Sequence, residues 1–93
     1  MANLQSIQFA NCNENSAQNF NRITIGGLVT LWFSYSTIVA FRTADTGLVV
    51  CENIWSRTTG KHLNWLDPYK EHRLDREEFL RKLDNINLKI TLE

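Results

Sequence analysis

The sequence predicts an α+β fold: an antiparallel β-meander sheet of four or five strands, covered on one face by a C-terminal helix, plus one short helix. Segments 28–33, 37–43 and 48–53 are rich in β-branched and aromatic residues, which favour strands. The connections between these segments are so short that neighbouring strands must run antiparallel. Segment 75–86 carries apolar residues at helical spacing, which suits a helix lying across the sheet.

Composition places the chain among single-domain globular proteins. Its 93 residues support one core, so we expect one domain over residues 1–91 and interpret residues 92–93 as a cloning remnant. Ten basic and ten acidic side chains cancel, which leaves no overall field to attract nucleic acid or anionic lipid. Any nucleic-acid contact would therefore need a local patch.

The sequence also predicts a cytoplasmic location without membrane contact. The N-terminus lacks the basic and apolar regions of a signal peptide, and no apolar run reaches the length of about 18 residues that a membrane span needs. Cys12 and Cys51 form no paired-cysteine motif, so we interpret them as free thiols of a reducing compartment. A single disulfide between them is the alternative.

The N-terminal part predicts the remaining strands. Residues 4–10 are consistent with a strand, and residues 23–25 form a short β-prone run. Between them, residues 11–21 contain five asparagines, which favour a loop because asparagine bonds its own backbone. Gly26 and Gly27 stop the second run and are expected to bend or bulge the strand.

The hairpin at residues 34–36 sets the expected register. A three-residue turn there places Val39 opposite Leu31 and Phe41 opposite Val29, which gives one apolar face. The other face would be only partly polar and would offer an exposed apolar patch or a subunit contact. Its apolar members are Trp32, Ile38 and Ala40.

At the C-terminus, Asp75 is placed to cap a helix over residues 75–86. Leu74 before the cap and Phe79 in the helix form a hydrophobic staple. Residues 88–91 alternate between polar and apolar and are expected to add a last edge strand. The helical stripe expected to face the sheet is Phe79, Leu80, Leu83 and Ile86.

The chemically richest stretch is residues 55–67. Part of it resembles a phosphate loop, but the first glycine and the final hydroxyl residue of that motif are missing. We instead expect a helix start that Thr58 or Thr59 caps and that ends before Pro68, with free N–H groups that attract anions. The candidate ligand-binding residues are Trp55, Arg57, Thr59, Gly60, Lys61, His62 and Trp65.

The sequence assigns no metal site, no cofactor and no catalytic residue. His62 and His72 are the only histidines, and they lack the spacing of metal ligands. His62 could act as a general base with Ser56 or Thr59 nearby, yet no orienting carboxylate stands in register. A hydrogen-bonded histidine at a helix end is the favoured interpretation, so the sequence favours a non-enzyme without deciding the question.

Aromatic and basic residues suggest an alternative role, a stacking platform for single-stranded nucleic acid. Residues 54–76 contain five basic and three acidic side chains, which is a mild excess. Tryptophans in a core or an interface are the competing interpretation. The platform would comprise Trp32, Tyr35, Arg42, Trp55, Arg57, Lys61 and Trp65.

Two motifs carry a resemblance to a known family. Residues 33–41 read Phe-Ser-Tyr-x-Thr-x-Val-Ala-Phe, and residues 55–64 read Trp-Ser-x-Thr-Thr-Gly-Lys-His-Leu-Asn. Over residues 25–83 the chain resembles a family of small uncharacterised proteins of bacteria and their phages. The resemblance implies a phage or mobile-element background and a stand-alone accessory protein, and it brings no activity with it.

The leading hypothesis is a non-catalytic binding or interaction module whose partner is itself or another protein. Self-association would use a sheet face or a sheet edge. A small enzyme that uses His62 is the second alternative. The first alternative is binding of single-stranded nucleic acid through Trp55, Arg57, Lys61, His62 and Trp65.

Overall fold

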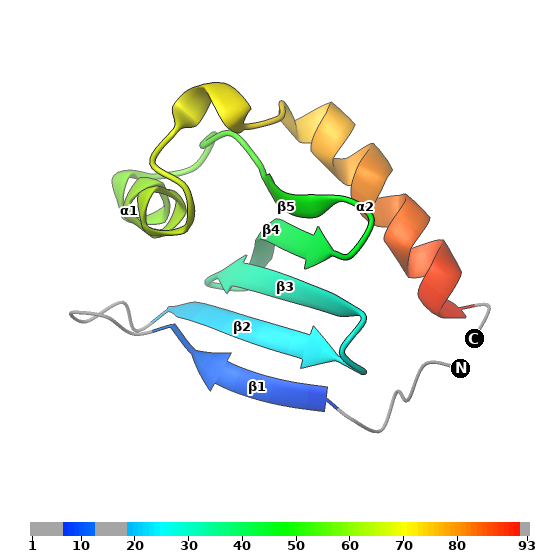
Figure 1. The fold of residues 1–93 in the computed structure, drawn as a ribbon. Coiled ribbons are helices and arrows are strands. Elements are labelled where there is room, and N and C mark those ends of the chain that lie inside the picture. The colour runs from blue at the N-terminus through cyan, green and yellow to red at the C-terminus, as the bar shows by residue number, and fades with distance from the viewer. Residues whose placement is uncertain (1–6, 13–18, 92–93) are drawn as a thin grey trace.

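The computed structural model describes residues 7–12 and 19–91, which form a five-stranded antiparallel sheet, two α-helices and a short 3-10 helix (Figure 1). The strands lie side by side in chain order, so the predicted meander and the α+β class are confirmed. The strands are β1 (Ile7–Asn11), β2 (Phe20–Ile25), β3 (Val29–Ser34), β4 (Thr37–Thr43) and β5 (Gly47–Val50). The helices are α1 (Arg57–Leu66), η1 (Lys70–His72) and α2 (Arg76–Thr91).

Left-handed backbone closes the hairpin turns that follow β2, β3 and β4, the last of them at Gly47 with φ of 68°. Gly26 and Gly27, with φ of 58° and 70°, connect β2 to β3, and the Leu28 N–H donates to the Ile25 carbonyl at 3.0 Å. The predicted bend or bulge at these glycines is therefore wrong, because their positive φ angles close a hairpin instead. Tyr35, with φ of 58°, begins the two-residue turn between β3 and β4.

A β-bulge interrupts the pairing of β3 with β4. Phe33 pairs with Ile38, but the preceding residue Trp32 pairs with Ala40. Val39 is therefore an extra residue in β4, and the alternation of side chains between the two faces is reset at this point.

The observed register differs from the predicted one. Leu31 lies opposite Phe41 instead of Val39, and Val29 lies opposite Thr43. The prediction assumed a three-residue turn and a regular ladder, whereas the chain combines a two-residue turn with the bulge.

The bulge allows both faces of β4 to be covered. Val39, Ala40 and Phe41 are consecutive in the chain, and all three are fully buried. The two helices lie over opposite faces of the sheet, and each has its own apolar cluster (Figure 1). The cluster under α1 is Cys12, Phe20, Trp32, Val39, Ala40, Val50 and Leu63. The cluster under α2 is Val29, Phe41, Cys51, Phe79, Leu83 and Ile86.

The second sheet face is not the exposed apolar patch expected from the sequence. Trp32 is only 5 % exposed and Ala40 is fully buried, because both belong to the cluster that α1 covers. Ile38 lies on the opposite face and packs against the α2 cluster, because the bulge separates it from Ala40 in the alternation.

The two edges of the sheet differ. Next to β5, Cys51 forms a parallel bridge with Leu74; the Glu52 N–H donates to the Leu74 carbonyl at 2.8 Å, and the Leu74 N–H donates to the Val50 carbonyl at 2.9 Å. The strand predicted over residues 48–53 ends at Val50 because the chain leaves the ladder at this bridge. At the other edge, β1 pairs with β2 alone within the described part of the chain.

The asparagine-rich loop predicted over residues 11–21 is too long at both ends. Asn11 belongs to β1, and Phe20 begins β2, because the Phe20 ring is 1 % exposed in the core. Residues 13–18 lie outside the described residues, as do residues 4–6 of the predicted first strand.

The start of α2 has the predicted cap and staple. The Glu78 N–H donates to Asp75 Oδ1 at 2.9 Å, and Leu74 packs against the cluster that contains Phe79. The edge strand predicted over residues 88–91 is wrong, because α2 continues through this segment.

Arg76 connects α2 to the bulge. Its Nη1 donates to the Ile38 carbonyl at 3.1 Å. This hydrogen bond satisfies a backbone carbonyl that lies beside the bulge. Its guanidinium carbon lies 5.0 Å from the centroid of the Trp55 ring and 5.5 Å from that of Phe79. One side chain therefore joins helix, sheet and the segment before α1.

Replacing Arg76 with methionine should lower the free energy of unfolding by about 1–3 kcal/mol, because a hydrogen bond from a charged donor and two cation–π contacts are lost. Urea unfolding followed by tryptophan fluorescence measures the loss. The matched control is Arg81→Met on the same helix, which removes an exposed ion pair with Glu78 (2.9 Å) and should cost less than about 1 kcal/mol. Equal losses in both variants would contradict the role of Arg76.

Candidate functional site

Side-chain caps determine where α1 begins. The Ser56 hydroxyl accepts a hydrogen bond from the Thr59 N–H at 3.2 Å, so Ser56 is the N-cap and the predicted caps, Thr58 or Thr59, are wrong. Asn53 organises the preceding turn: its Oδ1 accepts from the Trp55 N–H and its Nδ2 donates to the Ser56 carbonyl, both at 3.0 Å. This turn fixes the helix start earlier than the sequence pattern suggested.

The inner face of α1 carries a buried network of hydrogen bonds. The Ser34 hydroxyl, at the end of β3, lies 2.9 Å from Thr59 Oγ1 and 2.8 Å from His62 Nδ1. The three residues are only 2 %, 3 % and 5 % exposed. The His62 ring stacks on Phe20 with a centroid distance of 4.6 Å and an interplanar angle of 4°. Two predicted site residues, Thr59 and His62, therefore face the sheet.

Ser34 and His62 are within the distance of a nucleophile and its base, but their surroundings oppose that use. Burial lowers the pKa of His62, so the ring is neutral at pH 7. Among the described residues, His62 makes no hydrogen bond to a carboxylate that would orient it. The geometry is that of a structural histidine, as the sequence favoured, although it lies inside α1 and not at its end.

The outer face of α1 brings three predicted site residues together. Arg57, Lys61 and Trp65 recur at every fourth position, and all are exposed, Trp65 by 51 %. Trp65 packs edge to face on Phe20 at 5.6 Å. Tyr35 is 53 % exposed, and its ring lies 6.4 Å from the histidine of the same stack. We call Tyr35, Arg57, Lys61 and Trp65 the α1 stripe.

The other members of the predicted stacking platform lie elsewhere. Trp55 packs against Arg76 at the start of α2. Trp32 is buried under α1, and the guanidinium carbon of Arg42 lies 5.6 Å from its ring centroid. The structure therefore brings together only the part of the platform that forms the α1 stripe.

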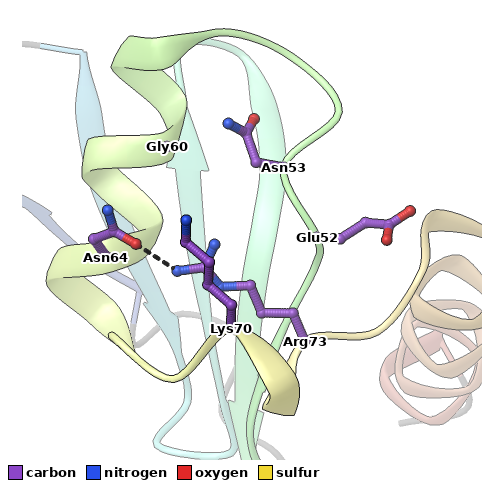
Figure 2. A pocket seen from close by; sticks show the side chains of 6 residues that line it. All are labelled: Glu52, Asn53, Gly60, Asn64, Lys70 and Arg73. Carbon is purple, nitrogen blue, oxygen red and sulfur yellow. Dashed lines mark hydrogen bonds between the residues drawn. The ribbon is translucent and has the colours of Figure 1, made fainter.

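A polar pocket of about 400 Å³ lies beside α1 (Figure 2). Gly60 is the predicted site residue in its wall: a Cβ there would lie 2.9 Å from Asn53 Nδ2, so glycine permits the close approach of that side chain. The sequence missed the rest, because four lining residues come from turns with no motif or periodicity. The lining residues are Glu52, Asn53, Gly60, Asn64, Lys70 and Arg73.

The cysteines are free thiols, buried in the clusters on opposite faces of the sheet. Burial raises the pKa of both Cys12 and Cys51. Within residues 7–12 and 19–91, no three His, Cys, Asp or Glu side chains are grouped so that they could hold a metal ion. In the same residues, no helix has both the length and the apolar character needed to cross a membrane.

The buried state of His62 predicts a pH dependence. Below about pH 6.5 the unfolded chain binds a proton that the folded ring resists, so the free energy of unfolding should fall as the pH drops from about 7.5 to 5.5. His62→Gln should reduce this fall, whereas His72→Gln, at a largely exposed histidine, should preserve the contribution of His62. Urea unfolding at the two pH values measures it. An unchanged fall in His62→Gln would contradict the prediction.

Comparison with known proteins gives a family and no activity. No curated protein and no solved structure matches the chain. A family model described as a family of unknown function, DUF8033, matches residues 2–82, which is most of the chain. The chain therefore belongs to the DUF8033 family, an uncharacterised family as the sequence resemblance predicted.

Proposed function

We propose that the protein is a non-catalytic interaction module that self-associates by pairing β1 of one copy with β1 of a second copy. The observation that carries the proposal is the edge at β1, which pairs on one side only among residues 7–12 and 19–91, and where Phe9 is 67 % exposed. Natural proteins usually protect edge strands with charges, proline or bulges. β1 has the sequence Ile-Gln-Phe-Ala-Asn, without charge or proline, and it pairs with β2 without a register shift.

The geometry suits a symmetric dimer. Two β1 strands that pair antiparallel about a two-fold axis would extend the sheet across the interface, and each copy would supply the same surface. A register centred on Phe9 would place the two phenyl rings as a cross-strand pair. Phe9 lies opposite Ile23 in β2, so this pair would continue an apolar row of the sheet.

The rest of the sheet supports β1 as the contact. The sequence hypothesis named a sheet face or a sheet edge; the second face is covered by α1, and the Leu74 bridge holds the edge at the end of β5, next to Val50. In the described part of the chain, no segment pairs with the outer side of β1 at any position, whereas Leu74 bonds to the end of β5 (Figure 1). The buried His62 network offers a substrate no access, which supports a module without catalysis through His62.

Phe9→Lys should convert the dimer to a monomer, because the substitution places two like charges opposite each other across the proposed interface. Light scattering over a range of protein concentrations measures the change, and circular dichroism should show an unchanged fold because Phe9 is exposed. Leu80→Lys is the matched control, since Leu80 is 39 % exposed on α2. A wild-type protein that stays monomeric at high concentration would refute the proposal, as would a dimeric Phe9→Lys.

The α1 stripe supports a second candidate, binding of single-stranded nucleic acid. Two cations and the exposed Trp65 ring lie along one side of α1, and the exposed Tyr35 ring lies 6.4 Å from His62 of the same helix; stacked bases and phosphates need such rings and cations. This set of candidate residues is smaller than the set expected from the sequence. Trp55 is left out because its ring packs against the Arg76 guanidinium, and His62 is left out because it is buried.

Trp65→Ala should weaken binding of a single-stranded oligonucleotide about fivefold or more, because stacking of one base on an aromatic ring is worth about 1–3 kcal/mol. Fluorescence titration at low salt measures the affinity, and Trp55→Ala is the matched control. If both variants lose affinity equally, or if the wild type binds nothing, the α1 stripe is not a nucleic-acid site.

The phage or mobile-element background and the role as a stand-alone accessory protein belong to the same proposal. They rest on the resemblance carried by residues 33–41 and 55–64. An enzyme that uses His62 is the interpretation that the burial of Ser34 and His62 supports least.

A further inference from the structure

The walls of the polar pocket are held in place by bonds within the protein. Asn53 bonds the turn before α1 through both atoms of its amide. The Arg73 Nη2 donates to Asn64 Oδ1 at 2.8 Å and to the Asp67 carbonyl at 2.9 Å, which fixes both side chains (Figure 2). A site whose polar groups are already positioned loses little conformational entropy when a ligand binds.

These bonds use the amide oxygens of Asn53 and Asn64 and leave several hydrogen-bond donors of the pocket without a partner in these bonds. The amide oxygens of Asn53 and Asn64 both accept hydrogen bonds from the protein. The Asn64 amide nitrogen, the second proton of the Asn53 amide, the Lys70 ammonium and the remaining N–H groups of Arg73 are left to donate. A pocket with spare donors selects a ligand rich in acceptors.

The charges of the pocket also favour a ligand rich in acceptors, and in particular a negatively charged one. η1 is a 3-10 helix, so Lys70 and Arg73, three residues apart, come to the same side of the turn. Neither cation forms a salt bridge in the described part of the chain. The carboxylate of Glu52 also lines the pocket, but Figure 2 shows it directed away from the Lys70 and Arg73 head groups. Two neighbouring cations are therefore left without a counter-charge.

We propose that this pocket binds the phosphate group of a small phosphomonoester. A phosphate monoester carries close to two negative charges at neutral pH and three acceptor oxygens, which match two cations and two amide donors better than a carboxylate does. The pocket volume of about 400 Å³ lies in the range of small-molecule sites and leaves room for a polar group attached to the phosphate. The site is independent of β1 pairing and extends the proposed function.

The test is a titration of the folded, full-length protein with inorganic phosphate at constant ionic strength, followed by NMR. The side-chain amides of Asn53 and Asn64 line the pocket and report on it directly, and the Arg73 Nε–H, which is buried without a hydrogen-bond partner among the described residues, reports on the guanidinium. We expect these signals to shift together and to saturate, with a Kd on the order of 1 mM. Acetate should move them less, and adenosine monophosphate should bind more tightly than phosphate.

Lys70→Gln should weaken phosphate binding about three- to fivefold, as expected for one partly exposed ion pair, without unfolding the protein, because Lys70 is exposed. Lys82→Gln on the exposed side of α2 is the matched control and should change nothing. The proposal is overturned if the pocket signals do not respond to phosphate, or if both variants weaken binding equally. It is also overturned if a 5′-phosphorylated oligonucleotide binds the pocket and phosphate or adenosine monophosphate cannot displace it, since the ligand would then be a polymer.

Discussion

The packing of the whole domain depends on the extra residue in β4. A regular strand presents alternate side chains to each face, yet Val39, Ala40 and Phe41 are all fully buried. The bulge makes this arrangement feasible, because it directs Val39 and Ala40 to the α1 cluster and Phe41 to the α2 cluster. The two helices can therefore share one thin sheet, and Arg76 fastens the second helix at the same point.

The features of the fold that depend on residues close together in the chain could be predicted from the sequence. Strand composition, the Asp75 cap and the staple of Leu74 with Phe79 are properties of neighbouring residues, and the structure has them where they were expected. The bulge depends on how β4 pairs with β3, and the alternating pattern of residues 88–91 did not indicate that α2 continues through them. A pattern in a single sequence does not show which residue of a strand its neighbour will leave unpaired.

The residues of the predicted site are separated in the structure, some exposed and some buried, and long-range contacts are the reason. Arg57, Lys61 and Trp65, which were among the candidate residues predicted from the sequence, lie on one side of α1 because they are four residues apart. The sequence pattern could not show that His62 would meet Ser34, because that contact joins residues 28 positions apart. The histidine that looked most reactive in the sequence is instead part of the connection between α1 and the sheet, and chemically useful polar groups lie in turns that carried no signal.

The bridge between β5 and Leu74 has a consequence for how this family can change. The chain leaves the sheet at Glu52 and returns at Leu74, and two backbone hydrogen bonds of 2.8 and 2.9 Å hold these two points together. The segment between these two points, with α1 and η1, is thus a long connection whose two ends are held by the sheet. Because closing a longer loop costs little extra entropy, insertions in the turns of this connection would leave the sheet intact. The turns of this connection are therefore positions where relatives can differ in their binding surface while the sheet stays the same.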